Sequence, residues 1–420
     1  MADSSFVVNG PTVRPAALAG IRVLDISGPI GNYCGKLFAD MGADVILIEP
    51  PTGTQLRFEP PFLDDTVGLE RSLSYAYHNT SKRGITLDLG VGAGQDIFRR
   101  LVTTADIVLE TEKPEVMQHR ELDYEALARL NPRIVLTSIT PFGQTGPYAE
   151  FEAEDLIGLA LGGLLYMGGY LDSAPTRVHG NQAYLGASMF GAVATMLAAL
   201  EAECSGVGQH IDVSMQECVS IALENAAQTY DLEGTVRKRP NPEQRYAGYG
   251  VFECKDGYIY LGARGIGRSK AWDRSLSWYA DEGMVGVERL YGPEWSQITY
   301  LKSEEARHVF GELFMPWAKA RTKAYLYHEG QRRKIPLAPV NCPADLLANP
   351  QLKFREHFVS VKHVLRDQPL LMPGAPYKLS ETPWHIQRPA PKLGEHNIEV
   401  YREIGVGLAE LSALISDGVV

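Results

Sequence analysis

The sequence has few cysteines and no pattern that would pair them or make them metal ligands. The five cysteines are Cys34, Cys204, Cys218, Cys254 and Cys342, without a Cys-x-x-Cys pair and without histidines at metal-ligand spacing. An odd and scattered set argues against a disulfide framework and against a zinc site. We therefore expect no metal centre and a reducing, cytoplasmic setting.

Positive charge and long apolar runs are also scarce. Lysine and arginine number 40 against 51 aspartates and glutamates, which gives a formal net charge of -11. Such a field repels polyanions, so we expect neither a nucleic-acid partner nor an anionic membrane surface. No stretch reaches the roughly 18 apolar residues of a membrane helix. The first twenty residues also lack a basic segment followed by an apolar one, so no secretory leader is expected.

Length and composition indicate a globular protein of more than one domain. The chain has 420 residues, 45% of them hydrophobic and 22% charged, and one hydrophobic core rarely organises so many. No Walker loop and no Gly-x-Ser-x-Gly elbow appears. Gly28, Gly31 and Gly35 occupy the place of a dinucleotide-binding turn but miss the G-x-G-x-x-G spacing. Tight turns between strands and helices explain these glycines better.

The first half of the chain alternates between strand and helix patterns. Apolar, β-branched runs alternate with amphipathic segments, a pattern typical of a doubly wound, Rossmann-like α/β domain with a parallel sheet. The expected strands are 21–27, 44–49, 84–89, 106–110, 133–140 and 209–214, and the expected helices are 33–43, 95–104, 123–130, one from 155, one over 184–203 and one over 215–232.

The rest of the chain predicts a second, smaller α+β domain and a return to the first. The polar segment 236–245 carries two prolines and is typical of a linker. Lys255-Asp256-Gly257 lies between two short β patterns, which is a strong hairpin signal. We predict a large domain starting with residues 1–235, a small domain over 236–335 and a return segment over 336–420 that completes the large domain.

Asp155 opens an apolar helix after Glu150, Glu152 and Glu154. Acidic residues in a first helical turn interact favourably with the helix dipole, which is a structural explanation. A carboxylate in this place could equally act on a bound substrate. The residues alone leave both interpretations open.

Longer phrases resemble the class III CoA-transferases, which include formyl-CoA:oxalate and carnitine CoA-transferases and α-methylacyl-CoA racemase. They cover nearly the whole chain in one order and are VLDISGPIGNYCGKLFADMGADVILIEPPTG, NTSKRGITLDL, ADIVLE, ALARLNPRIVLTSITPFGQTGPY, DLIGLALGGLLYMGG, SGVGQHIDVSMQE and APKLGEHNIEVYREIG. The resemblance implies a large CoA-binding domain built from both chain ends, a small middle domain and two protomers interlocked as rings.

The resemblance also implies a missing nucleophile. Enzymes of this family use an aspartate 29 residues after the residue that starts the preceding apolar helix, and here that count runs from Asp155 to Tyr184. A carboxylate attacks the thioester to give a mixed anhydride, which the CoA thiolate can reopen. A phenol titrates near 10 and gives an ester instead, so Tyr184 is a poor replacement.

The positions that the family uses for CoA have changed as well. Thr111 and Glu112 replace an Asn-Phe pair, and His119 replaces an arginine, although Arg120 follows directly. The candidate cofactor-binding positions are Leu87, Asp88, Gly90, Thr111, Lys113 and Arg120. Because basic and stacking groups are lost together, we expect the CoA thioester to be bound mainly by a partner subunit.

The small domain keeps a second family pattern. RYAGYGVFECKDGYIYLG resembles the carnitine CoA-transferase sequence, whose glycine loop shields the intermediate in the partner protomer. The resemblance therefore assigns Tyr246, Gly248 and Gly250 to a substrate loop acting in trans. A plain turn before a hairpin would also need these glycines, and this alternative stays open.

Together these features predict the non-catalytic subunit of a heteromeric class III CoA-transferase, working with a homologous catalytic subunit. The resemblance is greatest to the branch that transfers CoA from succinyl-CoA to (R)-benzylsuccinate in anaerobic toluene breakdown. One alternative is a homodimer that uses Asp155 or another carboxylate as nucleophile. The others are an α-methylacyl-CoA racemase-like enzyme and a scaffold with no role in the site.

Overall fold

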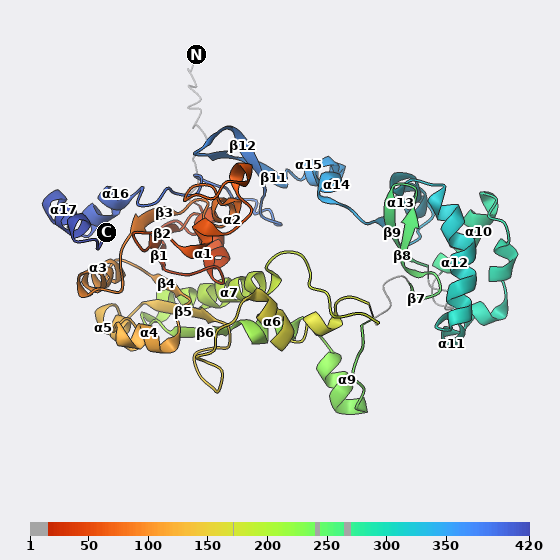
Figure 1. Cartoon of the computed structure of the whole chain (residues 1–420), viewed down its shortest axis with the longest axis horizontal. Coiled ribbons are helices and arrows are strands. Elements are labelled where there is room, and N and C mark those ends of the chain that lie inside the picture. The colour runs from red at the N-terminus through yellow and green to blue at the C-terminus, as the bar shows by residue number, and fades with distance from the viewer. Residues whose placement is uncertain (1–15, 171, 240–243, 264–269) are drawn as a thin grey trace, which may run out of the picture. The chain divides into compact units, whose positions relative to one another are not determined.

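The computed structural model describes residues 16–420 except 171, 240–243 and 264–269. The chain folds as two compact units (Figure 1). Each unit has its own hydrophobic core. The large unit comprises the described residues up to Leu165 together with Val178–Gln228 and Arg355–Val420, and the small unit comprises Tyr166–Arg177 and Thr229–Phe354.

A six-stranded parallel sheet forms the centre of the large unit, in the order β3-β2-β1-β4-β5-β6. Its strands are nearly continuous apolar runs, as expected when both faces of a parallel sheet are covered. The predicted α/β class is therefore confirmed. The strands are β1 (Arg22–Asp25), β2 (Asp44–Glu49), β3 (Arg83–Thr86), β4 (Ile107–Glu110), β5 (Val135–Thr140) and β6 (His210–Ser214).

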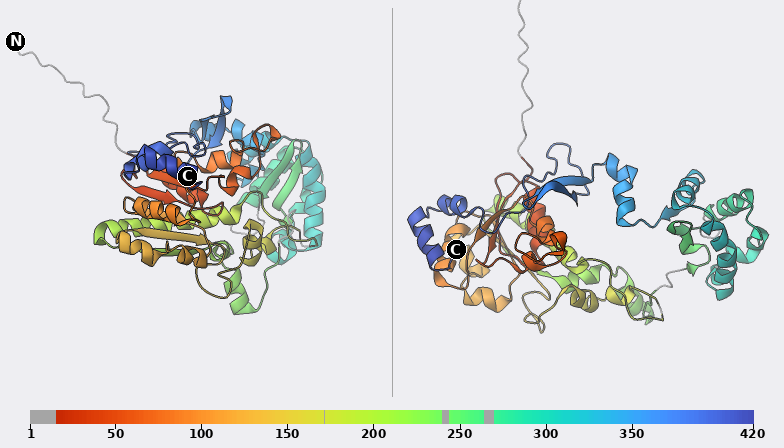
Figure 2. Two further views of the ribbon diagram at one scale, coloured as in Figure 1. Left: turned by 60° about the vertical axis from the view of Figure 1, so that its left-hand side comes forward. Right: turned by 45° about the horizontal axis from the view of Figure 1, so that its top comes forward.

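Helices cover both faces of this sheet (Figure 2). Alternate strand residues point to opposite faces, so Val23 joins the core beneath α1 and α7 while Leu24 joins the core beneath α3, α5, α16 and α17. The helices of the large unit are α1 (Asn32–Asp40), α2 (Leu73–His78), α3 (Gly92–Val102), α4 (Pro114–His119), α5 (Tyr124–Leu130), α6 (Asp155–Leu161), α7 (Gln182–Ser205), α8 (Met215–Ile221), α16 (Asn397–Glu403) and α17 (Leu408–Ser416).

Helix α7 differs from the expectation that no apolar stretch is long enough for a membrane span. By length and composition alone, this helix could cross a membrane. Core helices of water-soluble domains pass the same test, and α7 packs on β5, β6, α1, α6 and α8 within the large unit. Apolar residues on its other side are exposed, namely Met189, Phe190, Val193, Leu197 and Leu200.

The C-terminal segment completes the large unit beside β3. The backbone N–H of Gly84 donates to His396 Nδ1 at 3.1 Å, and that of Thr86 donates to Asn397 Oδ1 at 2.9 Å. The N–H of Asp88 donates to the carbonyl of Val419 at 2.7 Å. The segment also forms a two-stranded sheet, β11 (Phe358–His363) and β12 (Arg366–Pro373).

The small unit is an antiparallel sheet packed against helices around an aromatic core. Its strands lie in the order β10-β9-β8-β7, and the predicted hairpin turns at Gly257, whose φ is +139°. The elements are β7 (Gln244–Tyr246), β8 (Tyr249–Cys254), β9 (Gly257–Gly262), β10 (Leu337–Pro339), α9 (Ala226–Glu233, which also overlaps the end of the large unit), α10 (Ala271–Asp281), α11 (Ile298–Leu301), α12 (Glu304–Lys319), α13 (Lys323–Arg332), α14 (Pro343–Ala348) and α15 (Pro350–Phe354).

The limits of this unit differ from the predicted domain 236–335. On the C-terminal side it extends to Phe354. Within this extension, Asp345 Oδ2 on α14 pairs with Lys323 Nζ on α13 at 2.6 Å. The segment Tyr166–Arg177 is tied in by Arg239, which donates to the carbonyls of Tyr166, Tyr170 and Ser173.

The single helix predicted over 215–232 is wrong, because the chain forms α8 and α9 instead. The residues 222–225 between them form a turn, in which Glu224 has a φ of +51°. A non-glycine residue with positive φ is uncommon and breaks the regular helical hydrogen bonding.

Candidate active site

The predicted cofactor positions follow two strands of the same parallel sheet. Leu87, Asp88 and Gly90 follow β3, while Thr111 and Lys113 follow β4. Because the carboxyl ends of parallel strands meet at one edge, both groups lie at the edge where α/β proteins bind ligands. β2 and β1 lie between them in the sheet.

Asp155 connects the start of α6 to the start of α7. The carboxylate is 5% exposed, and its Oδ1 accepts hydrogen bonds from the backbone N–H groups of Ala183 at 2.8 Å and Tyr184 at 3.1 Å. These are N–H groups of the first turn of α7, which have no acceptor within the helix, and the carboxylate also faces the positive end of the helix dipole. Asp155 therefore anchors the backbone of the residue at the nucleophile position.

Tyr184 is half-buried against the apolar core beneath α7. Burial raises the pKa of its phenol to about 12, and the charges of Asp155, Glu59 and Glu154 act in the same direction, while a hydrogen bond between the phenol and the backbone of Asp155 opposes them. The phenol is protonated at neutral pH as a result. It is a weak nucleophile in addition to having the wrong chemistry for an anhydride.

Glu59 acts electrostatically on Tyr184, although no sequence motif marks it. Burial and the charge of Glu154 raise the pKa of its carboxyl group, and its charge acts on the phenol of Tyr184. Its backbone carbonyl accepts a hydrogen bond from Ser72 Oγ at 2.7 Å, which fixes the segment. Glu59 belongs to the Pro-rich stretch after β2, where no motif or periodicity marks a functional residue.

The turn after β4 packs closely against the turn after β1. Thr111 Oγ1 accepts a hydrogen bond from the N–H of Gly28 at 2.8 Å. A Cβ added at Gly31 would lie 2.8 Å from the methyl group of Thr111, so the two turns are in close contact. The glycines of the first turn thus allow close packing of one turn on the other.

The cations near this turn are paired with carboxylates. Arg120 Nη1 lies 3.2 Å from Glu112 Oε1, and Lys113 Nζ lies 2.6 Å from Glu152 Oε1. An anionic cofactor would have to compete with these carboxylates for both cations. Both predicted cations of this turn therefore have carboxylate partners, whereas Leu87, Asp88 and Gly90 follow a strand that β2 and β1 separate from β4.

The turn after β3 offers little side-chain surface to a ligand. Leu87 is 2% exposed and belongs to the core. Asp88 Oδ1 accepts from the N–H of Gly90 at 2.7 Å, which closes the turn on itself. Of these three residues only Gly90 is exposed.

In the small unit the predicted substrate loop is a tight, buried turn between β7 and β8. Gly248 has a φ of +73°, and an added Cβ would lie 2.7 Å from the carbonyl oxygen of Ala263 and 2.8 Å from the ring of Trp272. Tyr246 stacks on Tyr249 with ring centroids 4.7 Å apart. Gly250 is buried in β8. The turn's own packing is sufficient to explain why it needs a glycine at position 248.

Within the described ranges, no group of three or more His, Cys, Asp or Glu side chains is placed to hold a metal ion.

Replacing Asp155 tests its anchoring role. Asp155→Ala removes the acceptor of two backbone N–H groups and should destabilise the chain by about 2 kcal/mol, whereas Asp155→Asn keeps one oxygen and should cost about 0.5–1 kcal/mol. Thermal unfolding followed by circular dichroism measures both. If Asp155 were the nucleophile instead, Asp155→Asn would abolish acyl transfer although the protein stays folded.

Comparisons with known proteins show the family of the chain. A family model described as CoA-transferase family III matches residues 18–397. This chain belongs to the CoA-transferase family III. It is 39% identical over 400 residues to succinyl-CoA:(R)-benzylsuccinate CoA-transferase subunit BbsE of Thauera aromatica, covering 95% of this chain and 97% of that protein.

Two further comparisons extend this result. The chain is 32% identical over 399 residues to a succinate–glutarate CoA-transferase of Agrobacterium fabrum, covering 93% of this chain and 96% of that protein. The crystal structure of a CAIB/BAIF family protein from Brucella suis superposes with a TM-score of 0.81 and 29% identity over 93% of this chain and all of that chain. Both sequence relatives have names that include succinate or succinyl-CoA.

Proposed function

We propose that this chain is a subunit of a cytoplasmic CoA-transferase that moves CoA from succinyl-CoA to a carboxylic acid such as (R)-benzylsuccinate, and that a homologous subunit supplies the nucleophile. The observation that carries the proposal is Tyr184, a protonated phenol where the family resemblance expects the attacking aspartate. The 39% identical relative is named as a subunit, which supports a heteromeric enzyme. Its name also supports the two substrates.

The exposed side of α7 supports a partner subunit. Met189, Val193, Leu197 and Leu200 recur at helical spacing and are 50 to 65% exposed. Adjacent apolar side chains on one helix face are typical of a protein interface rather than of a free surface. We therefore assign this face to contact with the catalytic subunit.

The small unit is proposed to serve the partner's site through the turn that contains Tyr246, Gly248 and Gly250. Because Gly248 is needed by the turn itself, replacing it would disturb the fold whether or not the turn has a role in catalysis. Arg245→Ala is a better test, since this side chain is exposed on β7 beside the turn. A lower kcat in the assembled complex, with unchanged unfolding of the variant, is the expected result.

The chain purified alone should form no acyl-enzyme. After incubation with succinyl-CoA, treatment with hydroxylamine or borohydride should modify no carboxylate in this chain, while the assembled complex should yield an adduct on the partner only. Peptide mass spectrometry locates the modification. An adduct on Glu59 or Asp155 would contradict the proposal and favour a homodimer with its own nucleophile. Glu59→Gln then shows which carboxylate is attacked.

Restoring a carboxylate at position 184 should not restore activity. In Tyr184→Asp the negative charges of Asp155, Glu59 and Glu154, which already act on the phenol, would oppose ionisation of the new carboxyl group, while Arg120 and Lys113 stay paired with acids. CoA binding is then too weak for turnover above the background of the unmodified chain. Succinyl-CoA turnover by the isolated variant, measured by chromatography, would show that loss of the nucleophile is the only defect. Tyr184→Asn is the matched control.

A further inference from the structure

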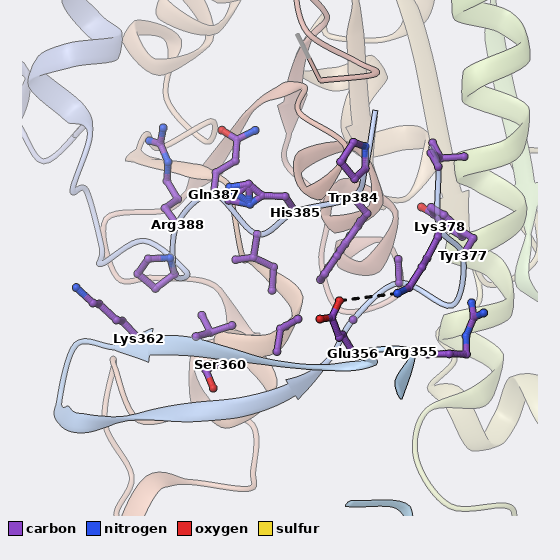
Figure 3. A pocket seen from close by; sticks show the side chains of 18 residues that line it. Arg355, Glu356, Ser360, Lys362, Tyr377, Lys378, Trp384, His385, Gln387 and Arg388 are labelled. Atoms are coloured by element: carbon purple, nitrogen blue, oxygen red, sulfur yellow. Dashed lines mark ion pairs between the residues drawn. The ribbon is translucent and has the colours of Figure 1, made fainter. Parts of the chain in front are cut away.

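A cavity of about 740 Å³ lies in the large unit, away from the residues of the candidate active site (Figure 3). It is formed by residues of β11, by Arg355 and Glu356 before this strand and by the segment 374–389, so every lining residue comes from the stretch 355–389. Cavities of 300 to 1,000 Å³ are typical of small-molecule sites. The cavity is large enough for a nucleotide or for an aryl acid.

Positive charge gathers around this cavity in a chain whose net charge is -11. Four cations line it, Arg355, Lys362, Lys378 and Arg388, against the single carboxylate of Glu356. The ion pair between Lys378 and Glu356 has a separation of 3.8 Å and is largely exposed, so it compensates little charge. This local excess of cations favours a ligand with two or more negative charges.

An indole ring lies among these cations. In Figure 3 Lys362 and Arg388 are at one end of the view and Arg355 and Lys378 at the other, with Trp384 between them. A Cβ added at Gly374 would lie 3.0 Å from the ring of Trp384, so the glycine lets the indole lie directly on the backbone. Trp384 is thereby held as a surface on which a second aromatic ring can stack.

We propose that this cavity binds a small ligand that combines an aromatic ring with at least two negative charges. The ring would stack on Trp384, and the charged groups would bind Lys362 and Arg388 at one end or Arg355 and Lys378 at the other. A nucleotide and an aryl dicarboxylate share this chemistry. The inference does not depend on the proposed function. The residues that line the cavity are different from those that hydrogen-bond to Asp155 at the start of α7.

Tryptophan fluorescence provides a direct test on the full chain. Four of the five tryptophans, Trp272, Trp278, Trp295 and Trp317, are buried in the small unit, and Trp384 is the fifth. Titration with ADP and, separately, with benzylsuccinate should change the fluorescence with a Kd below about 1 mM. The change should disappear in Trp384→Phe and weaken as the salt concentration rises.

Charge reversal supplies the matched control. Charge reversal of the pair that holds the ligand, either Lys362→Glu with Arg388→Glu or Arg355→Glu with Lys378→Glu, should weaken binding about tenfold or more. Arg366→Glu lies on the same hairpin but does not line the cavity, and it should leave binding unchanged. Binding of ADP alone identifies a nucleotide site, and binding of benzylsuccinate alone identifies an aryl-acid site. Failure of both ligands to bind, or equal weakening by Arg366→Glu, would overturn the proposal.

Discussion

Arg57→Met should destabilise the large unit by about 3–5 kcal/mol. The guanidinium is fully buried and forms two parallel hydrogen bonds with Glu49, from Nε at 2.8 Å and from Nη2 at 2.7 Å. Glu49 is itself 0% exposed. Methionine fills much of the space but leaves this carboxylate buried without its cation, which is the expensive part of the change.

The same side chain joins three distant parts of the chain. Besides Glu49 at the end of β2, Arg57 donates to Glu70 Oε2 at 3.1 Å and to the carbonyl of Pro391 at 3.1 Å. Tyr75 receives another hydrogen bond at 2.6 Å and lies beneath the guanidinium. Removal of the guanidinium should therefore free the segment around Pro391 from its contact with Arg57, and should also remove the hydrogen bonds at the end of β2.

Urea unfolding at neutral pH, followed by circular dichroism, measures the free energy of unfolding of the variant and of the unmodified chain. Arg99→Met is the matched control, because Arg99 pairs with Asp96 at the surface of the same unit, and it should change stability by less than about 1 kcal/mol. The double variant Arg57→Met with Glu49→Leu should recover part of the loss, since the unpaired charge is removed. A loss below 1 kcal/mol in Arg57→Met would show that water reaches Glu49.

The parallel sheet could be predicted from the sequence, whereas the burial of Arg57 could not. The strands are apolar runs separated by amphipathic helices, so a local pattern carries the information and β2 was predicted with the observed limits, Asp44–Glu49. Arg57 stands in a polar, Pro-rich stretch without periodicity. Its burial depends on Pro391, 334 residues away, and no local pattern records such a contact.

The candidate site was predictable only in part, and for a related reason. Family resemblance located Asp155 and Tyr184, and the chain indeed brings them into contact. Glu59 was missed because its electrostatic effect on Tyr184 depends on how a loop without a motif folds. At Gly248 the sequence could not separate a substrate loop from a turn, since both require a glycine with positive φ.

Glu110 should make stability depend on pH in a direction unusual for a carboxylate. The side chain ends β4 and is 1% exposed, and Oε2 accepts from the N–H of Glu112 at 2.6 Å. Burial raises the pKa of Glu110 to about 7, and the charges of Glu112 and Asp212 add to it, although hydrogen bonds from Ser138 and from the N–H of Glu112 lower it.

The sign follows from proton binding. Between its unfolded pKa, about 4.3, and a folded pKa of about 7, Glu110 is protonated in the folded chain and ionised in the unfolded one. Folding therefore takes up a proton, and the free energy of unfolding falls as the pH rises through this window. The contribution of Glu110 to the free energy of unfolding is therefore larger below this pH window than above it, by up to about 4 kcal/mol.

Glu110→Gln removes this titration while keeping an acceptor for Glu112. The variant should match the unmodified chain at pH 4.5 and be about 2–3 kcal/mol more stable at pH 8, where the unmodified chain holds a buried charge. Urea unfolding of both proteins over this range measures the difference. Glu115→Gln, at an exposed position of α4, should give a nearly constant difference. If Glu110→Gln also gives a constant difference, the carboxyl group of Glu110 titrates normally and solvent reaches the end of β4.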